Sequence, residues 1–189
     1  SFHPIALIFG LLSFVSYLVE GAVGDWSALY LFEDKGIVIE EAVMGVMLFN
    51  GTMCIGRLLG NRLGKHLTSK QVVVGGYLLG SIAMGLIVFL PGHASMYTYL
   101  LLGISLAMIV PNLFSAMGEQ NVIPMTQAVA TSTMLGYMGI LMGPALIGFI
   151  AHGTSLTVAF IVLTILLVVS AGTGKYAYML MEKSKEAEA

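Results

Sequence analysis

The sequence predicts an all-α membrane protein with six transmembrane helices, and three observations lead to this fold class. Of the 189 residues, 58% are hydrophobic and only 10% are charged, whereas about 25% are charged in a typical soluble domain. The mean hydropathy is +0.94. Residues 71–118 and 120–174 contain no Asp, Glu, Lys or Arg, and each stretch is long enough for two spans of about 20 residues. A soluble domain, a disordered chain and a nucleic-acid-binding protein are excluded, because each needs far more charged surface.

Short connections divide the chain into six apolar segments. Charged runs lie at 33–41 and 62–70, and Pro- or Gly-containing turns at 91–93 and 152–154 divide the two uncharged stretches. The alternating pattern of a β-barrel is absent, and 23 glycines favour close helix packing in lipid. We expect one bundle over residues 1–177, followed by a polar cytoplasmic tail at 178–189. Its spans should be 5–31, 42–62, 71–90, 96–117, 125–150 and 155–177.

The basic residues predict the orientation of the bundle. The second connection and its flanks carry Arg57, Arg62, Lys65 and Lys70, and no acidic residue occurs between positions 41 and 119. The positive-inside rule therefore places this connection in the cytoplasm, together with both ends of the chain. The chain has no initiator Met and is apolar almost from its first residue. We therefore expect a piece of a longer protein, cut just before a membrane helix.

One face of the first span holds the strongest candidate site. Polar or small residues recur there at helical spacing: Ser13, Tyr17, Glu20, Gly24 and Ser27. A carboxylate deep in a membrane is costly and usually faces a cavity or a partner. Glu20 is interpreted either as a substrate or proton site or as a structural carboxylate tied to a neighbouring helix. Glycines at 21 and 24 are expected to weaken the helix there, as in the discontinuous helices of transporters.

Polar residues in other spans supply further candidates. Asn50 in the second span and Tyr137 in the fifth are each interpreted as a site residue or as a bridge between helices. Asp25 and Trp26 are expected at a gate or a helix end on the outer side. Asn112 follows a proline that can kink the fourth span, so a gate or a packing role is open for it.

Enzyme motifs and metal-ligand spacings are not found in the sequence. It contains no Gly-rich phosphate loop, no Gly-x-Ser-x-Gly and no His-Glu-x-x-His motif. A single cysteine, Cys54, excludes a disulfide framework within the chain. We therefore expect neither an enzyme nor a bound metal or cofactor.

The segment from residue 56 to 66, GRLLGNRLGKH, resembles the loop signature of the major facilitator superfamily. The signature joins the second and third helices of each six-helix half. Here Asn61 stands where Asp is usual, and Arg57 is expected near the cytoplasmic end of its span, where it can snorkel. The remaining residues that match or flank the signature are Gly56, Gly60, Arg62, Gly64 and Lys65. Residues 139–148, with glycines at both ends and a Gly-Pro pair within, are similar to the fifth helix of such halves.

The resemblance implies a C-terminal half of a twelve-helix transporter, built as a 3+3 inverted repeat. The pattern Glu20-Gly21-x-x-x-Asp25-Trp26 is also similar to bacterial inner-membrane permeases of unassigned substrate, distantly like fucose permeases. By this resemblance, the first and fourth spans line the cavity and the second and fifth face the N-terminal half. We expect a secondary active transporter of a small solute, coupled to protons, that works by alternating access. The alternative is a six-helix scaffold or interaction module that transports nothing.

Overall fold

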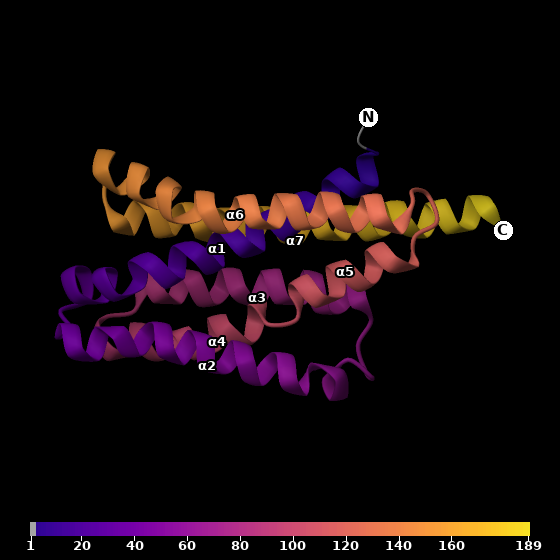
Figure 1. Cartoon of the computed structure of the whole chain (residues 1–189). Helices are drawn as coiled ribbons and strands as arrows, with labels where there is room; N and C mark the ends of the chain where they lie inside the picture. The colour runs from indigo at the N-terminus through magenta and orange to yellow at the C-terminus, as the bar shows by residue number, and fades with distance from the viewer. Residues whose placement is uncertain (1–2) are drawn as a thin grey trace.

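The computed structural model of the chain describes residues 3–189 and is all-helical over that range (Figure 1). The helices lie roughly side by side, with α6 and α7 at the top of the view, α2 and α4 at the bottom, and α1 and α3 between them. Their bounds are α1 Pro4–Lys35, α2 Ile39–Leu63, α3 Ser69–Phe89, α4 Gly92–Leu106, α5 Ile109–Glu119, α6 Met125–Gly153 and α7 Leu156–Glu188.

Six segments are long and apolar enough to cross a membrane, which confirms the expected number of spans. Five of the helix ends lie three or more residues from the expected ends of the spans. The largest difference is at the end of α7, which continues as a helix to Glu188 through the segment expected as a polar tail. The expectation followed hydropathy, which marks where lipid contact ends, whereas a helix can continue into water beyond that point.

Local sequence signals explain where several helices begin and end. Pro4 stands in the first turn of α1, where its missing N–H is not needed. Gly36 ends α1 in the left-handed conformation, with φ of 68°, which glycine adopts readily. Thr68 and Gln71 form a reciprocal capping box at the start of α3. The start and end of α1 and the start of α3 are therefore marked by local signals in the sequence.

The packing follows the pattern of a three-plus-three repeat. The first span packs most extensively on the fifth (α1 on α6), and the fourth packs on the second (α4 on α2). The third packs on the sixth (α3 on α7). If the first, second and third spans are exchanged with the fourth, fifth and sixth, the same pairs are obtained. Because each repeat has an odd number of spans, the two repeats run in opposite directions across the membrane.

Glycines bring the helix backbones together at these crossings. A Cβ atom on Gly139 or Gly143 of α6 would lie within 2.3 Å of a backbone carbonyl oxygen of α1. A Cβ atom on Gly103 of α4 would lie 2.3 Å from the Phe49 carbonyl oxygen of α2. No side chain fits at these contacts, so small residues permit the packing, as is common in membrane bundles. Gly21 of α1 has the same role, since its Cβ would lie 2.8 Å from the Ile140 carbonyl oxygen.

The discontinuous span is the fourth and not the first. Helix α1 is continuous through its glycines at 21 and 24, whereas the fourth span is interrupted between α4 and α5 at Ala107 and Met108. Pro111 explains the position of the interruption. It lies four residues after Ala107 and has no N–H to donate to the Ala107 carbonyl. The result is a free carbonyl in the interior of the bundle.

Candidate functional site

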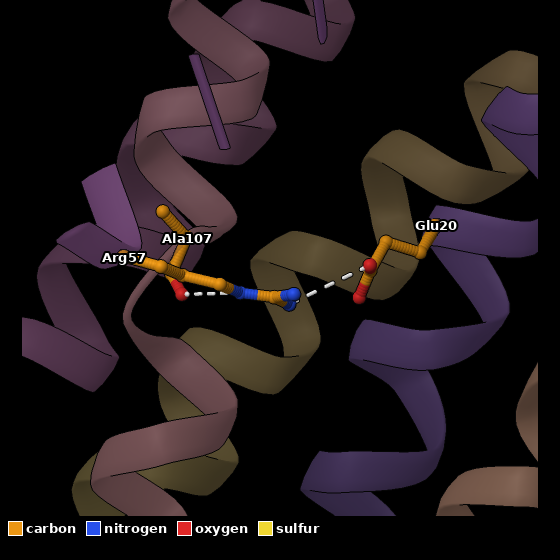
Figure 2. A network of polar contacts seen from close by, with 3 residues as sticks. All are labelled: Glu20, Arg57 and Ala107. Atoms are coloured by element: carbon orange, nitrogen blue, oxygen red, sulfur yellow. Dashed lines mark hydrogen bonds and ion pairs between the residues drawn. The ribbon is translucent and has the colours of Figure 1, made fainter. Parts of the chain in front are cut away.

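An ion pair between the first two spans lies at the centre of the candidate site. Glu20 stands midway along α1, and its Oε1 is 3.6 Å from Nη2 of Arg57 on α2 (Figure 2). The carboxylate points across the bundle toward α2 (Figure 2). A tied carboxylate was one of the two interpretations of Glu20, and Arg57 is the residue that ties it.

Arg57 has a second partner in the interrupted fourth span. Its Nε donates a hydrogen bond of 3.3 Å to the carbonyl oxygen of Ala107, the atom that Pro111 leaves without a helical donor. Figure 2 shows the guanidinium extended between this carbonyl and the carboxylate. The carbonyl is near the end of α4, where the helix dipole adds partial negative charge. One cation thus joins α1, α2 and the break between α4 and α5.

This arrangement differs from the expected placement of Arg57. The side chain does not snorkel toward the end of its helix but extends along a partly uncovered face of the bundle to two acceptors. Desolvating a lone guanidinium in an apolar bundle is unfavourable, and a carboxylate and a free carbonyl offset that cost. Snorkelling is the outcome for a cation without such partners.

The ion pair is only partly covered by other residues of the chain. The side chain of Glu20 is 20% exposed and that of Arg57 is 42% exposed. Gly24, one turn beyond Glu20, is exposed, and Tyr17, one turn before it, is half-buried. Tyr17 lies within electrostatic range of Glu20, Arg57 and Tyr137. We call Tyr17, Glu20, Arg57 and Tyr137 the polar cluster, and it lies on an uncovered face of the bundle.

The other residues expected at the site are placed differently. Ser13 is fully buried, and its hydroxyl finds no hydrogen-bond partner in the part of the chain that the structure describes. It therefore lies inside the helix packing rather than on the accessible face. Asn50 is exposed on α2, two turns before Arg57 and on the same side of that helix. Tyr137 is 67% exposed on α6.

The three residues expected at a gate or helix end are also separated. The indole nitrogen of Trp26 donates to the Pro144 carbonyl over 2.9 Å, which ties α1 to α6. Within residues 3–189, the exposed carboxylate of Asp25 makes neither a hydrogen bond nor an ion pair. The side-chain amide of Asn112 donates to the Met108 carbonyl over 2.8 Å and so satisfies the backbone at the break.

The residues of the loop signature divide into a packing group and an exposed group. Gly56 and Gly60 lie against the break, because a Cβ on either would overlap side-chain atoms of Ala107 or Met108. Gly64 ends α2. The exposed group comprises Asn61, Arg62 and Lys65, none of which forms a salt bridge among the described residues.

Two features of the candidate site were not predicted from the sequence, namely the pairing of Arg57 with Glu20 and the Ala107 carbonyl that lacks a helical donor. A signal for each exists in the sequence. Arg57 is seven residues from Asn50 and therefore shares a helix face with another polar residue. Pro111 predicts a free carbonyl four residues before it. No sequence rule joins these two signals, since they lie on different helices.

Comparison with known proteins places the chain among transporters. It is 40% identical over 172 residues, 89% of its length, to an uncharacterized MFS-type transporter of Yersinia pestis. It is 31% identical over 151 residues to the membrane protein MosC of Rhizobium meliloti. It is also 28% identical over 157 residues to the uncharacterized transporter y4wD of Sinorhizobium fredii. No family model matches the chain.

These relatives define the class of protein. The chain is a multi-pass membrane protein and a homologue of MFS-type transporters, and the relatives with a named activity are transporters rather than enzymes. It spans 44%, 37% and 41% of the length of the three relatives. This coverage is consistent with one half of such a transporter.

Proposed function

We propose that the chain is the C-terminal half of a secondary active transporter of the major facilitator superfamily in a bacterial inner membrane. It would move a small solute by alternating access together with an N-terminal six-helix half, with both ends in the cytoplasm. The observation that carries the proposal is the ion pair between Glu20 and Arg57, on an uncovered face at mid-span. The transporter names of the relatives support the same class.

Proton coupling follows from the chemistry of the pair. Protonation removes the charge of Glu20 and with it the attraction for Arg57, which keeps its bond to the Ala107 carbonyl. The ion pair between α1 and α2 is then lost, whereas the hydrogen bond between α2 and the α4–α5 break remains. Binding and release of one proton thereby change how these helices are tied together. We assign proton binding to Glu20 and control of the break to Arg57.

Tyr17 and Tyr137 supply the solute-binding part of the proposed site. Tyr17 lies within electrostatic range of both members of the ion pair and of Tyr137, and the two tyrosine hydroxyls offer neutral donors and acceptors on rigid rings. Asn50 adds an exposed amide on the α2 face that also carries Arg57. A polar solute would contact these groups from the uncovered side, opposite the N-terminal half.

A six-helix scaffold is the competing function, and one observation weighs against it. A scaffold has no need for a charged pair left partly uncovered in the middle of its spans, because such a pair contributes little stability relative to apolar packing. A transporter does need titratable groups at this depth.

The test is solute uptake by the full-length gene product in proteoliposomes. A thermal-shift screen against sugars, organic acids and drug-like cations first selects a solute, since a ligand stabilises the state that it binds. Uptake is then measured with and without an inward proton gradient. We expect the Glu20→Gln variant to lose gradient-driven accumulation but to retain exchange of labelled for unlabelled solute.

The control is the Glu20→Asp variant, which keeps a titratable group and should retain part of the coupled uptake. Unchanged gradient-driven accumulation in Glu20→Gln would remove Glu20 from the coupling mechanism. Absence of both uptake and exchange in the wild-type protein, for every solute that shifts its stability, would support the scaffold.

A further inference from the structure

An apolar groove between α2 and α3 is not used by the proposed transport mechanism. The two helices follow one another in the chain, yet among the described residues no Cα atom of α2 lies within 8 Å of a Cα atom of α3. Between them lies a groove of about 390 Å³, with α4 and the start of α5 as its floor. This volume is within the range of small-molecule sites, about 300–1,000 Å³.

Glycines create the space and aliphatic side chains line it. Gly60 and Gly64, at the end of α2, and Gly75 and Gly76 of α3 line the groove, and Gly60 and Gly76 let these helices pack closely on the floor, where a Cβ would overlap Met108 or the Ser105 carbonyl. A Cβ on Gly75 would meet no atom within 4 Å, so the space beside it is open. Leu67, Val72, Leu79 and Ile104 add apolar surface. The shape and chemistry suit a hydrocarbon chain.

The mouth of the groove is basic. Leu67 and Gln71 line the end next to the connection between α2 and α3, and that connection holds Lys65 and Lys70. Neither lysine forms a salt bridge among residues 3–189, and the sequence has no acidic residue between positions 41 and 119. An apolar groove with unpaired cations at its mouth has the complementary pattern of an anionic lipid.

We propose that the groove binds an anionic phospholipid, with an acyl chain between α2 and α3 and its phosphate at Lys65 and Lys70. Basic pockets between membrane helices are known to hold such head groups. The bound lipid would fill a gap beside the α4–α5 break, because Met108 and Asn112 lie in the groove floor. The occupant is thus a structural lipid in contact with the one interrupted span.

The experiment measures lipid retention by the full-length gene product. The protein is purified in mild detergent, exposed to equal amounts of phosphatidylglycerol and phosphatidylcholine, and analysed by native mass spectrometry. We expect phosphatidylglycerol to be retained preferentially. Each lysine near anionic lipid contributes about fivefold to binding, so Lys65→Gln combined with Lys70→Gln should lower the preference by about twenty-fivefold. The charge-matched control is Lys183→Gln with Lys185→Gln, in the last turns of α7, which should leave the preference unchanged.

A second variant tests the groove itself. Gly75→Phe fills the open space, and we expect it to lower retention of both lipids at least tenfold. Gly75→Leu replaces it if the larger side chain prevents purification. Gly172→Phe is the matched control, because Gly172 of α7 is also exposed with open space around it. Equal retention of the two lipids by the wild type, or equal retention by the Gly75 and Gly172 variants, would overturn the proposal and indicate ordinary bilayer contact only. Because the readout is lipid retention, its failure is distinguishable from failure of transport.

Discussion

The link between Glu20 and Arg57 predicts a measurable coupling energy. Replacing either residue by Gln removes one charge and leaves the other in an apolar environment. Each single variant therefore loses the attraction and also keeps an unpaired charge. In the double variant both charges are absent, and the second penalty disappears. The two substitutions should consequently be less harmful together than the sum of their separate effects.

The size of the coupling follows from the geometry. Two unit charges 3.6 Å apart attract by about 4–5 kcal/mol at an effective dielectric constant of about 20. This is an upper bound, because the side chain of Arg57 is 42% exposed and exposed pairs contribute only about 0.2–1 kcal/mol. The pair lies between these limits. We expect a coupling energy of about 1–2 kcal/mol, within the range measured for residues in contact.

The assay is a double-mutant cycle on reversible unfolding in mixed micelles. Wild type, Glu20→Gln, Arg57→Gln and the double variant are titrated with a denaturing detergent, and four unfolding free energies are compared. Additivity to within about 0.3–0.5 kcal/mol would refute the interaction. The control cycle pairs Asp25→Asn with Arg57→Gln. Asp25 is an exposed carboxylate on the same helix without a described partner, and its cycle should be additive.

Three further predictions concern packing and backbone. Gly139→Ala should lower the free energy of unfolding by about 1–3 kcal/mol, because its Cβ would lie 2.3 Å from a carbonyl oxygen of α1. Gly51→Ala, in open space on α2, is the control and should be neutral or stabilising. Equal effects of the two substitutions would contradict the close crossing of α1 and α6. Lys35→Met should lower the free energy of unfolding by about 1.5–3 kcal/mol, because the ammonium donates to two carbonyls at the end of α3, each over 2.7 Å. Thermal unfolding measures this loss. A loss under about 0.5 kcal/mol, typical of an ordinary surface substitution, would contradict the prediction. Pro111→Ala should raise the free energy of unfolding and slow solute uptake, because the new N–H of residue 111 competes with Arg57 for the Ala107 carbonyl. Unchanged uptake would show that this carbonyl has no role in transport.

The number of spans was predictable because lipid imposes simple rules. A backbone in hydrocarbon must satisfy its own hydrogen bonds, so every long apolar segment is a helix of nearly fixed length. Short segments that contain charged residues, Pro or Gly then mark the turns between helices. The ends of helices that continue into water carry no such signal. For that reason hydropathy placed the end of the sixth span at residue 177, whereas the helix that contains it continues to Glu188.

The candidate site was predictable only one helix at a time. Periodicity placed Glu20 on a polar face of α1, but it cannot say which neighbour covers each position of that face. Ser13 shares the face by spacing and is nevertheless fully buried, because α1 is enclosed differently along its length. Arg57 was expected to turn toward water, since the acceptors that hold it inside lie 37 residues before it and 50 residues after it in the chain. Contacts of that kind arise from the tertiary arrangement.

The position of Arg57 explains why a costly charge and a costly helix break occur together. A carboxylate alone would be poorly solvated at mid-span, and a carbonyl freed by Pro111 would be left without a donor. A guanidinium offers several donors in a planar fork, so one side chain satisfies both groups at once. A lysine, with a single compact charge, is less suited to bridge two acceptors on different helices. Removal of the carboxylate charge therefore changes the partners of the same cation that bonds to the break, and this shared partner is the physical basis of the coupling that we propose.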